Sequence, residues 1–187
     1  MKKTLLGFIL STVLFTTPAS AFLGSDSDNA KGLASIAVID MLKINKDAKV
    51  MISLNKQKDV ALDKIQKEVA EKRKTFESKE GELKAKQSVM DKEAFIKEIQ
   101  SFQSEVLNYD KQTEQKVAGV EKAYIAALKT IQDDYLYRIV NKIGKDKGYT
   151  LVFNAQTAIV LDKNLDITTD VIEALNDEIT EIELKTK

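Results

Sequence analysis

The chain contains no cysteine, no histidine and no tryptophan, and its only proline is Pro18. Without cysteine there can be no disulfide, no thiolate nucleophile and no cysteine-type metal site. Without histidine, a Ser-His-Asp triad, a histidine-ligated metal and a charge switch near neutral pH are also excluded. Any catalysis would have to depend on carboxylates or lysines. We therefore predict that the protein is not an enzyme and binds no cofactor or metal.

Charged residues are abundant and aromatic residues are few. Of the 187 residues, 31% are charged and 6% are aromatic, and 29 basic residues balance 29 acidic ones. The length corresponds to about one domain of roughly 100 to 200 residues. The absence of proline after Pro18 favours long helices, because an interior proline costs a helix about 3 kcal/mol. The composition predicts an elongated protein with more surface than core.

The first residues have the pattern of a secretory signal peptide. Lys2 and Lys3 precede an apolar run at residues 5–15, and a small-residue cleavage site ends at Ala21. The run is much shorter than the roughly 20 residues that span a bilayer as a helix. We predict cleavage after Ala21 and a soluble protein in the periplasm. Because ATP is not expected there, its activity should need no nucleotide.

The rest of the chain divides into a lead, a small body and a long helical insertion. Residues 22–35 show no period and predict a flexible lead. The apolar run 36–40 predicts a buried strand. Residues 45–147 predict a helical hairpin with its tip near 88–91. Residues 36–44 and 148–187 would form the small β/α body, so the predicted fold class is mostly α with a small β body.

The first arm of the predicted hairpin carries half of a coiled-coil seam. Asn45 is its predicted N-cap. Its apolar residues recur every seven positions at Leu62, Val69, Phe76, Leu83 and Met90. At the complementary heptad position, Ile65 is followed by Lys72, Lys79 and Lys86. Such an arm needs a partner, while its charged surface suggests ordinary pairs four residues apart, such as Glu68 with Lys72.

The second arm supplies that partner. Asp91 is its predicted N-cap, and Glu93 adds an acid in the first turn. Reversal at the tip would bring Phe76 against Val106 or Tyr109, in an antiparallel pair of arms about 60 to 80 Å long. The residues predicted to pack the hairpin are Leu62, Val69, Phe76, Leu83, Ile99, Phe102, Val106 and Tyr109. Apolar residues near the tip could instead touch a bound partner, namely Val89, Met90, Phe95 and Ile96.

The C-terminal part predicts a β-hairpin and a short helix. Gly148 follows lysines and ends the second arm. Residues 149–153 and 158–161 predict two short strands. A final helix would begin with Thr168 as its cap and Asp170 in its first turn, with an apolar stripe that reaches Ile182. Three short strands and one helix are too small for an independent core, so we expect a core shared between chains at Ile36, Val38, Leu151, Phe153, Ile159 and Leu161.

Two other chemistries find little support in the sequence. The neighbouring acids Asp133 and Asp134 would point about 100° apart on a helix and have no second carboxylate cluster beside them. Gly144 and Gly148 alone do not form a phosphate-binding glycine loop. The lysines alternate with acids, so we predict no nucleic-acid binding.

Three stretches of this sequence resemble the Skp (OmpH) family of periplasmic chaperones. Residues 36–41 are similar to the opening strand of the family, residues 143–152 to the junction after its long helices, and residues 165–176 to its closing motif. Gly144 stands where the family usually has alanine. The tail from Asp177 to Lys187 extends past the closing motif, and the resemblance assigns it no role.

The resemblance implies a homotrimer. Short strands of three chains would form a β trimerisation domain, from which three helical hairpins would extend as tentacles around a cavity. Unfolded outer-membrane proteins would be held in this cavity before membrane insertion, by a holdase that needs no ATP. Weak contact with lipid or lipopolysaccharide is a further implication, although family members are often more basic than this chain. The alternative that the residues leave open is a structural coiled-coil adaptor of the cell envelope that binds a folded partner.

Overall fold

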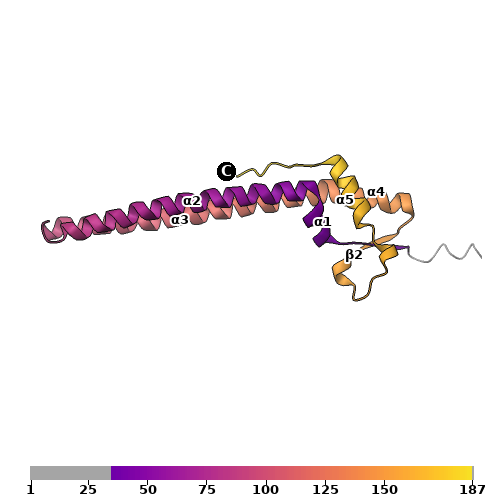
Figure 1. The fold of residues 1–187 in the computed structure, drawn as a ribbon, viewed down its shortest axis with the longest axis horizontal. Coiled ribbons are helices and arrows are strands. Elements are labelled where there is room, and N and C mark those ends of the chain that lie inside the picture. Colours follow the sequence, from indigo (N-terminus) through magenta and orange to yellow (C-terminus); the bar gives the residue numbers. More distant parts are fainter. Residues whose placement is uncertain (1–34, 187) are drawn as a thin grey trace, which may run out of the picture. The chain divides into compact units, whose positions relative to one another are not determined.

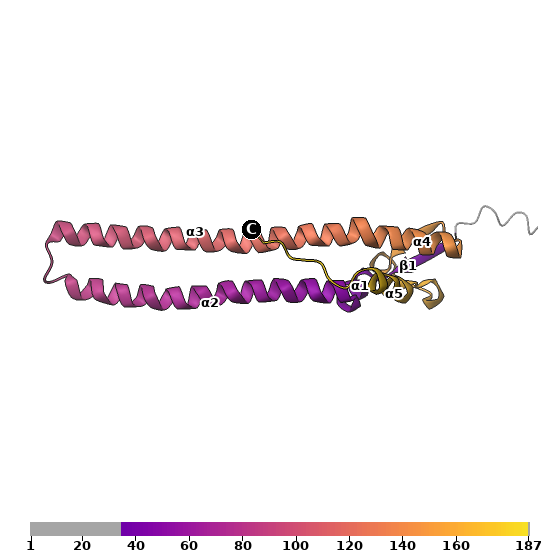
Figure 2. The same cartoon turned by 90° about the horizontal axis from the view of Figure 1, so that it is seen from above.

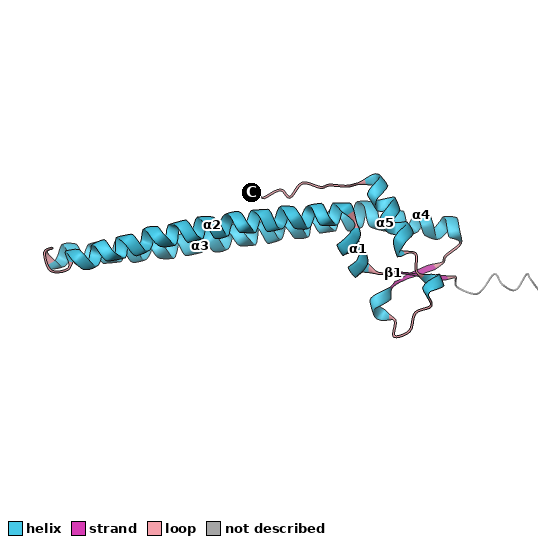
Figure 3. Cartoon of the chain, viewed as in Figure 1, coloured by secondary structure: helices cyan, strands magenta, loops and turns pink. Residues whose placement is uncertain are grey.

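The computed structural model of the protein describes residues 35–186. The predicted signal peptide and residues 22–34 of the predicted lead lie outside these residues. The described part is mostly helical with one two-stranded sheet (Figure 3). Its elements are β1 (Ile36–Ile39), α1 (Met41–Asp47), α2 (Lys49–Lys86), α3 (Lys92–Thr130), the π-helical turn η2 (Ile131–Leu136), α4 (Tyr137–Lys147), β2 (Leu151–Asn154), the 3-10 turns η3 (Ala155–Thr157) and η4 (Lys163–Leu165), and α5 (Thr168–Glu178).

The two strands are parallel, with Ile36 opposite Leu151 and Val38 opposite Phe153. Parallel neighbours require a long crossover connection, and here the whole helical insertion supplies it. The predicted β-hairpin is therefore wrong. Residues 158–161 form no strand, and Ile159 is fully exposed (102%). The Asn154 carboxamide accepts a hydrogen bond from the Gln156 amide at 3.3 Å, which turns the chain into η3 directly after β2.

The first helix begins earlier than the sequence predicted. The Asp40 carboxylate accepts hydrogen bonds from the amides of Leu42 (2.9 Å) and Lys43 (3.1 Å), so α1 starts directly after β1. The Lys43 amide is the main cause of the lowered pKa of Asp40. Asn45, the predicted cap, lies inside α1. The helical path is interrupted at Ala48, which is extended (ψ 132°), and α2 begins after it.

Helices α2 and α3 lie antiparallel along their length (Figures 1 and 2). The turn between them covers residues 87–91. Asp91 caps α3 as predicted, because its carboxylate accepts hydrogen bonds from the amides of Glu93 (3.0 Å) and Ala94 (3.2 Å). Glu93 adds a negative charge to the first turn, where it interacts favourably with the positive end of the helix dipole.

Helix α3 continues into α4 through η2. The buried residues along this path are Ala127, Ile131, Leu136 and Ile139, so one step spans five residues instead of three or four. A π turn accommodates the extra residue without breaking the helix. At its far end α4 stops at Gly148, whose φ of 76° is left-handed, in agreement with the predicted stop.

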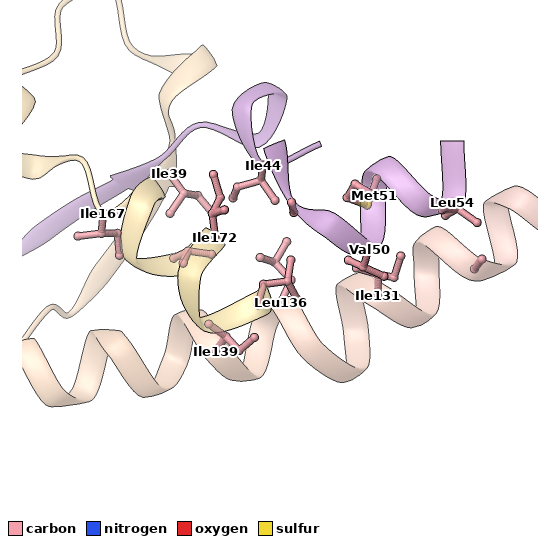
Figure 4. Packing of buried hydrophobic residues seen from close by; sticks show 14 of the residues in the cluster. Ile39, Ile44, Val50, Met51, Leu54, Ile131, Leu136, Ile139, Ile167 and Ile172 are labelled. Atoms are coloured by element: carbon pink, nitrogen blue, oxygen red, sulfur yellow. The ribbon is translucent and has the colours of Figure 1, made fainter. Parts of the chain in front are cut away.

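The hydrophobic core lies where the strands, α1, α5 and the bases of the long helices meet (Figure 4). The close-up shows Val50 beside Ile131, and Ile39, Ile44 and Ile172 on the neighbouring elements. Val50, Leu54, Val171 and Leu175 have no exposed surface. The long helices therefore contribute as much to this core as the predicted body does, which allows a small sheet to be stabilised.

Helix α5 begins at Thr168, with Ile167 at its N-cap position, so the predicted Thr168 cap is wrong by one residue, and a partly buried hydrogen-bond network surrounds the first turn. The Asp166 carboxylate accepts a hydrogen bond from the Thr168 amide at 2.9 Å and another from the Thr168 hydroxyl. The same hydroxyl oxygen accepts a hydrogen bond from the Asp40 amide at 2.8 Å, so α5 is tied to the start of α1. The predicted stripe extends too far, because α5 ends at Glu178 and Ile182 lies in an extended tail.

Alanine substitutions at Gly144 and Gly148 should have opposite effects. At Gly144 a Cβ would lie 3.7 Å from the Tyr149 carbonyl, an ordinary contact, so Gly144→Ala should stabilise the protein by about 0.5 to 1 kcal/mol. Gly148→Ala should destabilise it by about 1 to 2 kcal/mol, because alanine disfavours the left-handed conformation. Urea unfolding of both variants beside the parent protein measures this difference, and equal shifts would contradict it.

Candidate functional site

The seam between α2 and α3 is built around Phe76. Its ring contacts Phe102 (centroids 5.8 Å apart, planes at 78°) and Tyr109 (5.7 Å, 81°), both in edge-to-face geometry. The predicted contact of Phe76 with Tyr109 is therefore present. Val69, Phe76, Phe102, Val106 and Tyr109 also line a surface groove of about 530 Å³. The seam thus holds the arms together and leaves apolar surface open to solvent.

Ion pairs fill the half of the seam that lacks apolar residues. Lys72 and Lys79 both contact the Glu105 carboxylate, at 2.9 and 2.5 Å, and Lys86 lies 3.1 Å from Glu98. The Lys72 ammonium also lies 4.7 Å from the centre of the Phe76 ring. These lysines cover the aromatic residues with their aliphatic stems and keep their charges at the surface.

The predicted pairing of Glu68 with Lys72 is wrong. Glu68 instead pairs with Lys116 of α3 at 2.6 Å, and the contact lowers the pKa of Glu68 and raises the pKa of Lys116. Nearer the base, Lys58 pairs with Glu121 at 3.0 Å. Charges across the seam therefore align the two arms, because each pair requires a matching position on the opposite helix.

Acid should weaken the hairpin through Glu105. Hydrogen bonds from Lys79 and Lys72 hold the pKa of Glu105 below 4.5 in the folded protein. A carboxyl with a lowered folded pKa stabilises the fold above its unfolded pKa, and this stabilisation is lost as the pH falls through the folded pKa. The melting temperature should therefore fall on acidification below pH 4.5. Thermal melts followed by circular dichroism measure this change.

The variant Glu105→Gln should show a smaller acid-induced change than the parent protein. Glu114→Gln is the matched control, because Glu114 is an exposed glutamate of the same helix, α3. The control should keep the parent's acid response. An identical acid response in the parent and in both variants would contradict the role assigned to Glu105.

Apolar side chains are exposed both at the tip and along the arms. Of the four predicted contact residues at the tip, Val89 (83%) and Ile96 are exposed, while Met90 and Phe95 are half-buried. Sequence analysis missed Leu107 (69% exposed), Ile125 and Val60, which lie on the arms outside the seam. Their positions outside the seven-residue repeat are the signal that could have identified them.

The predicted shared core is mostly exposed in a single chain. Val38 is buried, whereas Ile36, Leu151, Phe153 and Ile159 are exposed and Leu161 is half-buried. Val160 is exposed as well. Large apolar residues therefore gather around β1, β2 and the loop that follows them. Exposed large apolar residues that gather in one region are typical of interaction surfaces.

The described residues offer neither a metal site nor a membrane span. Across residues 35–186 no group of three or more acidic, histidine or cysteine side chains is arranged to hold a metal ion. None of the described helices combines the length and the apolar character needed to cross a bilayer. Asp133 and Asp134 lie in η2, where Asp133 pairs with Lys129 at 2.6 Å.

These features define a class of protein: an antiparallel helical hairpin mounted on a small parallel sheet, with apolar surface left open on both. The family described as "Outer membrane protein (OmpH-like)" matches residues 35–175. The chain belongs to this OmpH-like family.

One solved structure supports the same fold. It is the crystal structure of a candidate outer membrane chaperone (OmpH-like) from Caulobacter crescentus CB15. The two chains are 14% identical, with a TM-score of 0.74 over 81% of this chain and 89% of the other. No curated protein sequence matches the chain.

Proposed function

We propose that the protein is an ATP-independent holdase chaperone of the periplasm. It binds unfolded outer-membrane proteins and prevents their aggregation before they insert into the membrane. The signal peptide predicted from the sequence directs export and is cleaved after Ala21. The mature chain forms a homotrimer through the sheet and its neighbouring loop, and the three hairpins surround the client.

The observation that carries this proposal is the apolar surface that the hairpin leaves open to solvent. The groove at Phe76 and the exposed Val89, Ile96 and Leu107 offer separate apolar contacts along both arms. Burial of one large side chain contributes roughly 1.5 to 3 kcal/mol before ordering costs. Many such weak contacts on three arms add through their effective concentration. A client would be held firmly and could still rearrange.

The exposed apolar residues of the sheet support a trimer. Ile36, Leu151 and Phe153 stand on the two paired strands, and Ile159 lies on the following loop. Assembly of three chains through these residues would bury them and would extend a sheet that has only two strands in one chain. Weak contact with lipid or lipopolysaccharide stays a prediction, as does the absence of nucleic-acid binding.

Dilution of a urea-unfolded outer-membrane β-barrel protein into the mature protein tests the proposal. Light scattering should show suppressed aggregation at one trimer per client without ATP, and the native mass should be that of three chains. A protein that leaves the aggregation unchanged overturns the holdase. Binding to one folded envelope protein with indifference to unfolded chains would support the structural adaptor instead.

The assembly can be tested separately at Phe153. The variant Phe153→Asp places a charge among the exposed apolar residues of the sheet and should dissociate the trimer, because burying an unpaired charge is costly. Ser88→Asp in the turn at the tip is the control and should leave the native mass unchanged. An unchanged mass for both variants contradicts assembly through the sheet.

A further inference from the structure

The tail that follows α5 lies back along the hairpin. Residues 179–186 form no helix or strand and run beside the long helices towards their middle (Figures 1 and 2). The tail alternates over residues 181–185, because Ile182 and Leu184 are half-buried whereas Glu181, Glu183 and Lys185 are exposed. This alternation is that of a strand with one apolar face. The segment is thus an extended amphipathic peptide bound to its own chain.

Gln57 of α2 holds the backbone of this peptide. Its carboxamide donates a hydrogen bond to the Ile182 carbonyl (2.9 Å) and accepts one from the Leu184 amide (2.9 Å). One side chain therefore satisfies a donor and an acceptor of an extended backbone two residues apart. Such a contact does not depend on the side chains of the peptide. It would suit any extended segment with the same alternation.

The surface under the tail is formed by both long helices. On the α3 side, the small residues Ala123, Ala126 and Ala127 line a depression together with Ile182. On the α2 side, Val60 and Ala61 line another depression together with Leu184. Small residues allow a peptide backbone to approach closely. The tail thus occupies a groove between the two arms.

The tail leaves part of this groove open. Depressions of about 400 and 580 Å³ remain beside it, on the α3 and α2 sides. Val60 stays exposed. A peptide with larger apolar side chains at the alternate positions would bury more surface in the same place.

We propose that this groove, with Gln57 at its centre, is a binding site for extended segments of unfolded outer-membrane proteins, and that the tail occupies it as an intramolecular competitor. The proposal rests on the holdase function proposed above. Membrane β-strands alternate apolar and polar residues with a period of two, as the tail does. Covalent attachment gives the tail an effective concentration in the millimolar range, so a client must displace it.

A shortened protein that ends at Glu178 tests the site directly. A fluorescent peptide with the sequence of residues 179–187 should bind this protein, with one peptide per chain, and should bind the complete protein about tenfold more weakly. In the shortened protein, Gln57→Ala should abolish peptide binding. Gln66→Ala, at an exposed glutamine of the same helix, should leave it unchanged. The proposal is overturned if the peptide binds equally to the shortened and complete proteins, or if Gln57→Ala does not weaken its binding.

A second experiment measures binding of the unfolded β-barrel protein itself. The shortened protein should hold it about tenfold more tightly than the complete protein, and the added peptide should compete. If the complete protein holds the client but the shortening changes nothing and the peptide does not compete, this inference fails while the holdase stands. If the peptide binds through Gln57 but neither protein holds the client, the site is supported and the holdase fails.

A variant of the complete chain replaces the shortened protein if that protein does not fold. Ile182→Asp and Leu184→Asp together should release the tail by charging its two inward positions, and should tighten client binding as the shortening does. Glu183→Asp at an exposed position of the tail is the control and should leave client binding unchanged. Client affinity that is the same in all three proteins overturns the proposal.

Discussion

Replacement of Leu175 by alanine is expected to lower the free energy of unfolding by about 2 to 5 kcal/mol. Leu175 is fully buried in the core near the end of α5. Helix α5 packs against α1, α4 and η2, so the cavity would be surrounded by several elements that cannot all close on it. Because the same core supports the sheet, any assembly through β1 and β2 should weaken together with the fold.

Chemical unfolding followed by circular dichroism measures this loss. The parent and variant proteins must be compared at the same chain concentration, because assembly makes apparent stability depend on concentration. Leu107→Ala is the matched control, since it removes the same atoms from a side chain that is 69% exposed in α3. The control should change stability by less than about 0.5 kcal/mol. Equal losses in the two variants would show that Leu175 is not part of a tightly packed core.

The second large effect is expected at Phe76, and it should be local. Phe76→Ala removes the contacts with Phe102 and Tyr109 and should cost about 2 to 3 kcal/mol. Beyond these rings the arms are held mainly by buried Leu83 and by surface ion pairs, and such pairs contribute little. The part of the hairpin nearest the tip should therefore open without unfolding of the base.

Hydrogen exchange of backbone amides separates these two regions. In Phe76→Ala, residues 77–108 should exchange faster, while the core around Leu54 and Ile139 keeps its protection. Phe76→Leu, which keeps apolar volume but removes the ring, should show an intermediate effect. Uniformly faster exchange along the whole chain would mean that the hairpin and the base unfold as one unit.

Local sequence signals predicted the helical hairpin well. The seven-residue repeat identified the seam, including the contact between Phe76 and Tyr109. Asp91 caps the start of α3, and Gly148 ends α4 in the left-handed conformation, as the preferences of aspartate and glycine predicted. Each of these features depends on residues within a few positions in the sequence, or on a repeat that extends over many turns. Membership in the OmpH-like family could also be inferred from three short stretches.

Features that depend on distant partners were missed. The helix break at Ala48 accompanies a hydrogen bond from the Lys49 amide to the Asn176 carboxamide. Residues 149–153 and 158–161 were predicted to form a hairpin, because short strands close in sequence usually pair with each other. Here β2 pairs instead with β1, from the other side of the helical insertion, and η3 turns the chain directly after β2. The β-propensity of residues 158–161 alone could not reveal this outcome.

The candidate site shows the same division. The apolar residues of the seam follow from the repeat, but the groove under the tail does not. Gln57 and Ile182 are 125 residues apart, and a glutamine on a charged helix carries no signal of a backbone partner. The alternation of residues 181–185 was the available clue. It was obscured because an apolar stripe on α5 appeared to continue into the tail.

The contrast between the repeating arms and η2 limits how the length of this protein can change. One additional heptad in α2 and one in α3 would lengthen the arms by about 10 Å and leave the pairing of faces nearly unchanged. A single residue added to η2, which already accommodates one extra residue, would instead turn α4 by about 100° and carry Ile139 away from α5. Insertions should therefore be tolerated in multiples of seven in the arms, whereas a single inserted residue should be rejected near Ile131, so that the length of the hairpin can differ between relatives while its base stays the same.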